Sequence, residues 1–207
     1  GSSSADADNT SASTDGKTLR VAMELAYPPF ETKDDAGNPE GLAVDFIRDF
    51  GAAYGYDVQI ENTAWDGLIP SLQSDKADLV ISSMTITDER KQSVDFSTSY
   101  ATGIQSIVVK EDSPITSVDD LYADGADYQI GVQQDTTGDI YCSDDFGDDH
   151  VQRFNKGADA VATLVSGKLD CVVIDNEPAK SFVAANEGLK VLDTAYTTED
   201  YCAAMNK

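Results

Sequence analysis

The side chains best suited to bind a ligand lie in segment 82–90, SSMTITDER, where serine and threonine hydroxyls precede an arginine. Thr87 followed by two acids indicates a helix start, so Arg90 falls in the first turn, where the helix dipole disfavours a cation. An anion bound at the free N–H groups of this turn would offset that cost, and Arg90 would complete a charge-assisted clamp. In the alternative, Arg90 turns away and pairs with a surface acid.

A second helix start with anion-binding potential lies in segment 131–138, GVQQDTTG. Asp135 leads into Thr136 and Thr137, which favour a hydroxyl cap, and Gly138 adds backbone freedom. The free N–H groups of this turn suit an anion, although a simple capped helix explains the same residues.

Two further strands end in a carboxylate. Asp175 closes the apolar strand CVVID, where it either pairs with a ligand ammonium or caps the helix that begins at Pro178. Glu24 closes the first strand, and Tyr27 and Trp65 lie at nearby junctions. The two aromatic rings are either ordinary core residues or cleft walls that would stack on an apolar or cationic group.

Strand-like and helix-like segments alternate along the chain, which predicts an α/β fold with mainly parallel sheets. The predicted strands are 19–24, 57–61, 78–82, 128–132, 150–154, 171–175 and 189–193. The predicted helices are an amphipathic helix ending at Gly55, two helices at 66–75 and 158–167, and two that begin at Thr137 and Pro178. On the amphipathic helix, the residues predicted to be buried are Leu42, Phe46, Ile47, Phe50 and Ala53.

An internal match indicates that the chain forms two lobes rather than one sheet. Segment 71–81, SLQSDKADLVI, and segment 163–173, TLVSGKLDCVV, share leucine, serine, lysine, aspartate and valine in register. A general likeness between helix–turn–strand units explains part of this match. Because ligands bind beyond the carboxyl ends of strands in open α/β sheets, the register predicts that Ser83 and Asp175 face each other across a cleft.

The composition is strongly acidic, with 38 Asp and Glu against 14 Lys and Arg, a formal net charge of -24. Such a surface repels nucleic acid and anionic lipid headgroups, so we expect neither as a partner. The excess of acidic residues is consistent with attraction of cationic ligands or with a protein surface adapted to high salt. The hydrophobic fraction of 41% suffices for a core, and no apolar run has the length of a membrane span.

The small polar residues 1–16 predict a flexible leader, either the tether of an exported protein or a plain tail. The three cysteines fit no zinc pattern, and we expect Cys171 and Cys202 to be buried, inert thiols. His150 is interpreted as a solvated loop residue. We therefore expect no metal ion and no cofactor.

The sequence also resembles a known family, the extracytoplasmic solute-binding proteins of ABC importers for polar amino acids. The motifs that carry the resemblance are YPPFE (27–31), GLAVDFIRDF (41–50), WDGLIPSLQSDKADLVISSMTITDER (65–90), VDFSTSY (94–100), GVQQDTTG (131–138) and VIDNEPA (173–179). The resemblance covers roughly residues 17–207, and segment 82–90 with its upstream strand is its most specific part.

This resemblance implies a periplasmic-binding-protein-like (type II) fold, in which two lobes joined by hinge strands close on a ligand cleft. It implies lobe 1 at 17–101 and 198–207, and lobe 2 at 102–197. Arg90 and the main chain at Thr85 and Thr137 would then hold an α-carboxylate. Ser83, Thr85 and Asp175 would hold the ammonium, and the residues facing the ligand side chain would be Glu24, Tyr27, Trp65 and Ser82.

The sequence departs from the family pattern at two places. Asp135 stands where the family usually has glycine, and the family continues beyond strand 201–207 with helices that cover lobe 1. The expected function is extracytoplasmic binding of a free polar or cationic amino acid and its delivery to an ABC importer permease, by a monomeric protein that is not an enzyme. The alternative is a dehydratase-type enzyme on the same scaffold, with Glu24 as its acid.

Overall fold

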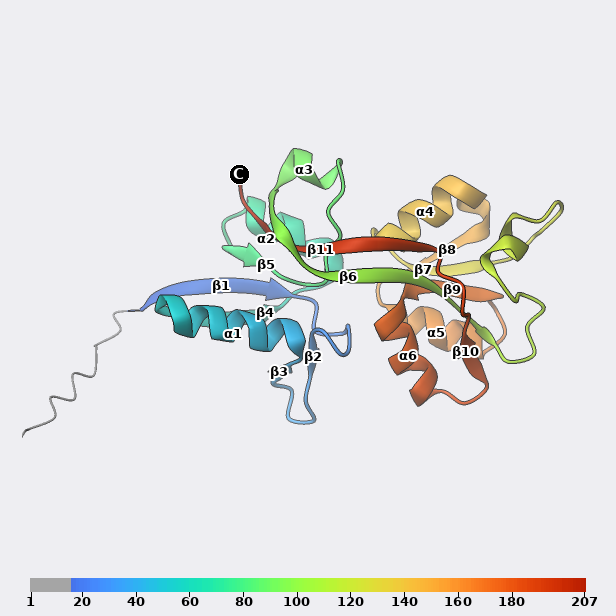
Figure 1. Ribbon diagram of the computed structural model, residues 1–207, viewed down its shortest axis with the longest axis horizontal. Coiled ribbons are helices and arrows are strands. Elements are labelled where there is room, and N and C mark those ends of the chain that lie inside the picture. Colours follow the sequence, from blue (N-terminus) through green and yellow to red (C-terminus); the bar gives the residue numbers. More distant parts are fainter. Residues whose placement is uncertain (1–15) are drawn as a thin grey trace, which may run out of the picture.

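The computed structural model describes residues 16–207, so the predicted leader lies almost wholly outside the described residues (Figure 1). The helices are α1 (Leu42–Tyr54), α2 (Leu68–Gln73), α3 (Arg90–Ser93), α4 (Thr137–Phe146), α5 (Gly157–Val165) and α6 (Asn176–Ala185), with short 3₁₀ turns at Trp65–Gly67, Val118–Tyr122 and Asp148–His150. The strands are β1 (Lys17–Met23), β2 (Thr32–Lys33), β3 (Pro39–Glu40), β4 (Tyr56–Asn62), β5 (Leu79–Val80), β6 (Asp95–Lys110), β7 (Ile130–Gln133), β8 (Val151–Phe154), β9 (Cys171–Asp175), β10 (Leu189–Val191) and β11 (Thr197–Met205).

The first half of the chain forms a parallel unit in the strand order β4-β1-β5. Because successive strand residues point to opposite faces, Val21 and Met23 pack toward α1, while Ala22 packs toward α2. The helices therefore cover opposite faces of this part of the sheet (Figure 1).

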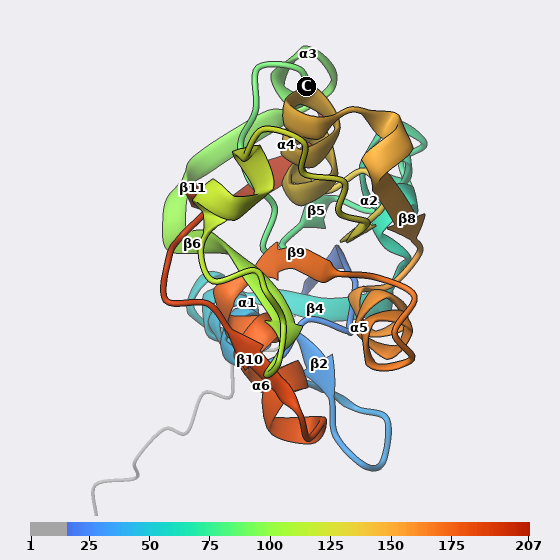
Figure 2. The ribbon, with the colours of Figure 1, turned by 90° about the vertical axis from the view of Figure 1, so that its right-hand side faces the viewer.

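The second half repeats this arrangement in the order β8-β7-β9, again with its first strand in the middle. Helix α4 covers one face, and α5 and α6 cover the other (Figure 2). The aligned aspartates of the repeat make equivalent hydrogen bonds. Asp78 Oδ2 accepts from Arg20 N at 2.9 Å, and Asp170 Oδ2 accepts from Gln129 N at 2.7 Å. The predicted repeat is therefore a structural one.

The two halves are joined by β6 and β11, which pair antiparallel over most of their length. Both strands run through the two halves, so the strands form one mixed nine-stranded sheet in the order β4-β1-β5-β11-β6-β9-β7-β8, with β10 on β6. The expectation of separate, mainly parallel sheets was wrong on this point, because the connecting strands themselves supply the hydrogen bonds between the units. Gly103 lies against the Tyr201 ring, where a Cβ would come within 2.2 Å of Oη.

The predicted buried face of α1 was largely wrong. Ile47 is buried, but Leu42, Phe46 and Phe50 are 57%, 49% and 38% exposed, and Ala53 is also exposed. The face that packs on the sheet consists instead of Ala43, Val44, Ile47 and Gly51. Gly51 lets the helix lie close to β4, since a Cβ at this position would come within 2.3 Å of Val58 Cγ2. The helix does end at Gly55, which has the left-handed φ of 75° typical of a C-terminal glycine.

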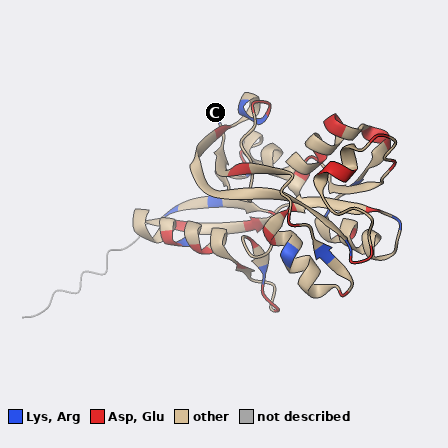
Figure 3. Ribbon diagram, turned by 45° about the vertical axis from the view of Figure 1, so that its right-hand side comes forward, with Lys and Arg blue, Asp and Glu red and all other residues tan. Residues whose placement is uncertain are grey.

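Acidic positions are distributed over both halves (Figure 3). Within residues 16–207, no helix has the length and apolar character that crossing a bilayer requires.

Candidate ligand-binding cleft

Most of the predicted site residues meet in one small cavity between the two halves. Its volume is about 20 Å³, and its lining residues are Tyr27, Trp65, Ser83, Thr85, Arg90, Gln133, Thr136, Thr137 and Asp175. Glu24 lies at an adjacent cavity of about 430 Å³ that also includes Trp65. Ser82 lines neither cavity, because its hydroxyl accepts a hydrogen bond from Glu24 N at 2.9 Å and fixes the end of β1.

Arg90 lies at the start of α3 and points into the cleft. Thr87 Oγ1 accepts from Arg90 N at 3.1 Å, the bond expected of a hydroxyl cap, although α3 itself begins at Arg90 and Glu89 before it makes no side-chain cap hydrogen bond. The guanidinium donates from Nη1 to the Thr85 carbonyl at 2.7 Å and from Nη2 to the Asp135 carbonyl at 3.0 Å. Its Cζ lies 5.4 Å from the centre of the Trp65 ring, within cation–π range. The alternative in which Arg90 pairs with a surface acid was therefore wrong.

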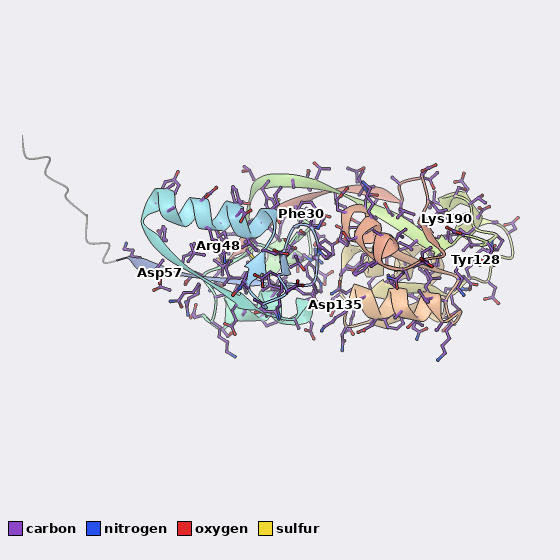
Figure 4. All side chains as sticks on the ribbon, turned by 90° about the horizontal axis from the view of Figure 1, so that it is seen from below. Phe30, Arg48, Asp57, Tyr128, Asp135 and Lys190 are labelled. Carbon is purple, nitrogen blue, oxygen red and sulfur yellow. The ribbon has the colours of Figure 1, made fainter. Side chains whose placement is uncertain are left out.

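The N-terminus of α4 meets Arg90 from the second half. Thr136 is the N-cap and accepts from Asp139 N at 3.4 Å. Asp135 adopts a left-handed φ of 60°, the conformation that glycine would take at no steric cost. Its carbonyl thereby faces the first half and also accepts from Trp65 Nε1 at 3.1 Å. Figure 4 places Asp135 at the junction of the two halves.

Asp175 closes β9 and is buried, with 7% of its surface exposed. Helix α6 begins directly after it at Asn176, two residues before the predicted Pro178, yet the Asp175 side chain makes no cap hydrogen bond. It accepts instead from Gln105 Nε2 and from the Tyr201 hydroxyl. The capping role was therefore wrong. Burial, reinforced by the nearby Glu199 charge, raises the pKa of Asp175 to about 7.

Glu24 is held by a residue from the opposite half. Gln133 Nε2 donates to Glu24 Oε1 at 2.9 Å and to Oε2 at 2.8 Å, and also to the Asn155 carbonyl at 3.2 Å. Burial raises the pKa of Glu24, and the Gln133 hydrogen bonds oppose that shift. Two exposed lysines, Lys33 and Lys156, line the same cavity.

Four buried polar residues of the cleft were missed from the sequence, namely Glu31, Gln105, Gln133 and Glu199. Gln105 lies in an apolar strand and Gln133 ends one, so a polar residue against the strand pattern was the available signal. Glu31 is fully buried, and neither of its carboxyl oxygens has a hydrogen-bond partner among the described residues. Burial raises the pKa of Glu31 well above its usual value.

The remaining candidate groups lie away from this cleft. All three cysteines are buried and unpaired, as predicted for Cys171 and Cys202. His150 is half-buried, and its Nδ1 lies 3.3 Å from the Tyr128 carbonyl, so it is not a freely solvated loop residue. Within the described part of the chain, no group of three or more His, Cys, Asp or Glu side chains is arranged to hold a metal ion.

Comparison with known proteins identifies the type of cleft. The sequence profile of the bacterial extracellular solute-binding proteins, family 3, matches residues 19–183. The chain belongs to this family. The resemblance predicted from the motifs is thereby confirmed, and so is the two-lobed fold.

Relatives within the family bind amino acids. The probable histidine-binding protein of Neisseria gonorrhoeae is 35% identical over 93% of this chain and 72% of its own length. The L-arginine-binding protein of Pseudomonas aeruginosa is 38% identical over 77% of this chain and 61% of its own length. The arginine-, lysine-, histidine-binding protein ArtJ from Geobacillus stearothermophilus is 36% identical, with a TM-score of 0.85 over 92% of this chain and 83% of ArtJ.

One solved structure bears on the enzyme alternative. It is the ancestral amino acid-binding protein AncCDT-1, a precursor of cyclohexadienyl dehydratase, which is 36% identical with a TM-score of 0.82 over 92% of this chain and 82% of its own. It is itself an amino-acid-binding protein, so it gives no positive support to a dehydratase role for this chain.

Proposed function

We propose that this protein binds a free amino acid with a cationic side chain between its two lobes and delivers it to an ABC importer outside the cytoplasm. The observation that carries the proposal is the meeting of Arg90 and Asp175 in one cavity from opposite halves of the chain. A free amino acid carries an anion and a cation on the same carbon, and this pair of side chains offers one partner for each.

The α-carboxylate would bind Arg90 and the free N–H groups at the start of α4. Both are charge-complementary to an anion, since the guanidinium is cationic and a helix N-terminus is positive. The guanidinium now donates to the carbonyls of Thr85 and Asp135, and a carboxylate is the stronger acceptor. The ammonium would bind Asp175 together with the hydroxyls of Ser83 and Thr85.

Binding requires the lobes to separate and close again. The cavity of about 20 Å³ has room for about one water molecule. An amino acid must therefore enter an opened cleft, and β6 and β11 are the strands about which the lobes would turn. We place the lobe boundaries within the paired region of β6 and β11, after Ala101 on β6 and before Thr198 on β11, which gives lobe 1 residues 17–101 and 198–207 and lobe 2 residues 102–197.

The ligand side chain would extend into the cavity of about 430 Å³ beside Glu24. A guanidinium, ammonium or imidazolium group there would pair with the Glu24 carboxylate and lie against Trp65. A neutral amide is the second candidate, because Gln133, itself an amide, already donates to both Glu24 oxygens. Lys33 and Lys156 also line this cavity, but both are exposed, whereas Glu24 is buried. An acidic ligand would place a further negative charge beside the buried Glu24, so we expect aspartate and glutamate to bind worst.

We further propose that the protein acts as a monomer, without catalysis, in the periplasm or as a cell-surface lipoprotein. The family is one of extracellular proteins, and its named relatives here are binding proteins.

The proposal is tested by a thermal-shift screen over the twenty common amino acids, followed by calorimetry and a turnover assay on the best ligand. We expect arginine, lysine or histidine to raise the melting temperature most, because a ligand bound only by the native state stabilises it. Glutamate as the best ligand would contradict the assignment of the side-chain cavity. Turnover of the bound ligand would favour the enzyme alternative.

A further inference from the structure

A second buried carboxylate lies behind Asp175 on the hinge strand β11. Glu199 is 5% exposed, and its Oε2 accepts from Gln105 Nε2 at 3.0 Å. Its other oxygen, Oε1, has no hydrogen-bond partner among the described residues.

Glu199 and Asp175 share one hydrogen-bond donor. Gln105 Nε2 donates to Asp175 Oδ1 as well as to Glu199, and it lies 3.4 Å from Thr137 Oγ1. The amide is neutral, so it orients the two acids without cancelling their charge. The charge of Glu199 therefore disfavours ionisation of Asp175, because a second negative charge there is repelled by the first.

The other groups around the pair leave this imbalance in place. Tyr27 lies near Asp175 and Tyr141 near Glu199, and burial raises the pKa of both tyrosines, of Tyr141 to about 12, so both hydroxyls stay neutral. Tyr201 contributes a third hydroxyl, which donates to Asp175. Glu31 adds another buried acid, and Arg90 is the nearby cation, whose guanidinium hydrogen bonds go to the carbonyls of Thr85 and Asp135 rather than to either acid.

We infer that Asp175 carries a proton in the ligand-free protein, beside Glu199 on the same Gln105 amide, and that the α-ammonium of the bound amino acid displaces this proton. The protonated Asp175 carboxyl loses its proton to solvent, and the resulting carboxylate pairs with the ammonium. No other reactant is needed. Glu199 is a positioning residue, because it acts through Asp175 and sets the acidity at which the site accepts an ammonium. This inference rests on the proposed amino-acid-binding function.

Release of a proton on ligand binding makes the dissociation constant depend on pH. With a pKa of about 7 for Asp175, a growing fraction of the site must release a proton on binding as the pH falls below neutral. The dissociation constant for L-arginine should therefore be about tenfold higher near pH 6 than near pH 8. Calorimetry in buffers of different ionisation enthalpy should give close to one proton released near pH 6 and almost none near pH 8.5.

Variants separate this linkage from a merely structural role. In Glu199→Gln the repulsion is gone, so proton release near pH 6 should fall by half or more. Glu199→Asp keeps the carboxylate and should retain the release. Glu187→Gln, at an exposed glutamate of the same lobe, is the matched control and should behave as wild type. Any proton released from Glu24 by the ligand guanidinium is common to all these proteins and cancels in the comparison.

Binding of L-arginine with no proton release near pH 6, or equal release in wild type and Glu199→Gln, would overturn the inference while leaving the proposed function intact. Carboxyl carbon NMR of the ligand-free protein tests it independently of the amino acid that binds. We expect Asp175 to titrate near pH 7 in wild type and at least one unit lower in Glu199→Gln. Titration of Asp175 in the usual acidic range in wild type would refute the protonated Asp175, whereas absence of any amino-acid binding would refute the proposed function.

Discussion

Replacing Arg90 by alanine is the most direct test of the carboxylate clamp. Arg90 is 9% exposed, and two of its guanidinium nitrogens donate within the cleft at 2.7 and 3.0 Å. If a ligand carboxylate takes over both donors, each charge-assisted bond contributes about 1.5–3 kcal/mol. Allowing for the neutral carbonyl bonds that are given up, Arg90→Ala should cost about 3 kcal/mol or more of binding free energy, which is roughly a hundredfold or more in affinity.

The same substitution should also affect the ligand-free protein. It removes a donor from the carbonyls of Thr85 and Asp135 and a cation from the Trp65 ring, so we expect about 1–3 kcal/mol loss in free energy of unfolding. Arg90→Lys keeps the charge but lacks the planar fork, and its affinity should fall between wild type and Arg90→Ala. Arg48→Ala, on the exposed surface of α1, is the matched control and should bind as wild type (Figure 4).

The assay is calorimetry on the ligand found by the thermal-shift screen, with circular dichroism and chemical denaturation to verify the fold of each variant. An Arg90→Ala protein that is folded and binds within a few-fold of wild type would refute the clamp. The carboxylate would then be held by the α4 N-terminus alone.

Three further outcomes are expected. Asp175→Asn keeps the shape of the side chain but loses its charge, so affinity measured near pH 8 should fall about tenfold or more, and normal binding would contradict the ammonium assignment. Glu24→Gln should weaken cationic amino acids selectively and spare neutral ones, and equal losses for both in competition assays would contradict the side-chain assignment. The folded-state pKa of Asp175 is about 7 against an ordinary value of 3.8, so the folded protein binds the proton more tightly. Its contribution to the free energy of unfolding should therefore decline as the pH rises from about 4 to about 7. Chemical denaturation of wild type and Asp175→Asn across this pH range measures that contribution. If the free energy of unfolding changes with pH equally in both proteins, Asp175 is not the cause of the decline.

The local pattern of the sequence determined most of the helices and strands and the polar residues at the strand ends that line the site. Strand alternation and helix caps are set by near neighbours, so β9 was predicted at its observed bounds. The carboxyl ends of β1 and β7 were predicted to within one residue, and that of β5 to within two. The repeat register brought Ser83 and Asp175 to one cavity, as predicted. The motifs in segment 82–90 identified the family, which the profile match confirms.

Contacts between distant residues were decided by the tertiary structure alone. The apolar residues of α1 allow two different faces of the helix to be buried. The face with Gly51 is buried because only that face can pack closely on β4. Gln105 finds its partners 70 and 94 residues away, and Gln133 reaches Glu24 across 109 residues. No local propensity encodes such pairs, because a buried polar group is satisfied by whatever the fold brings within hydrogen-bonding distance.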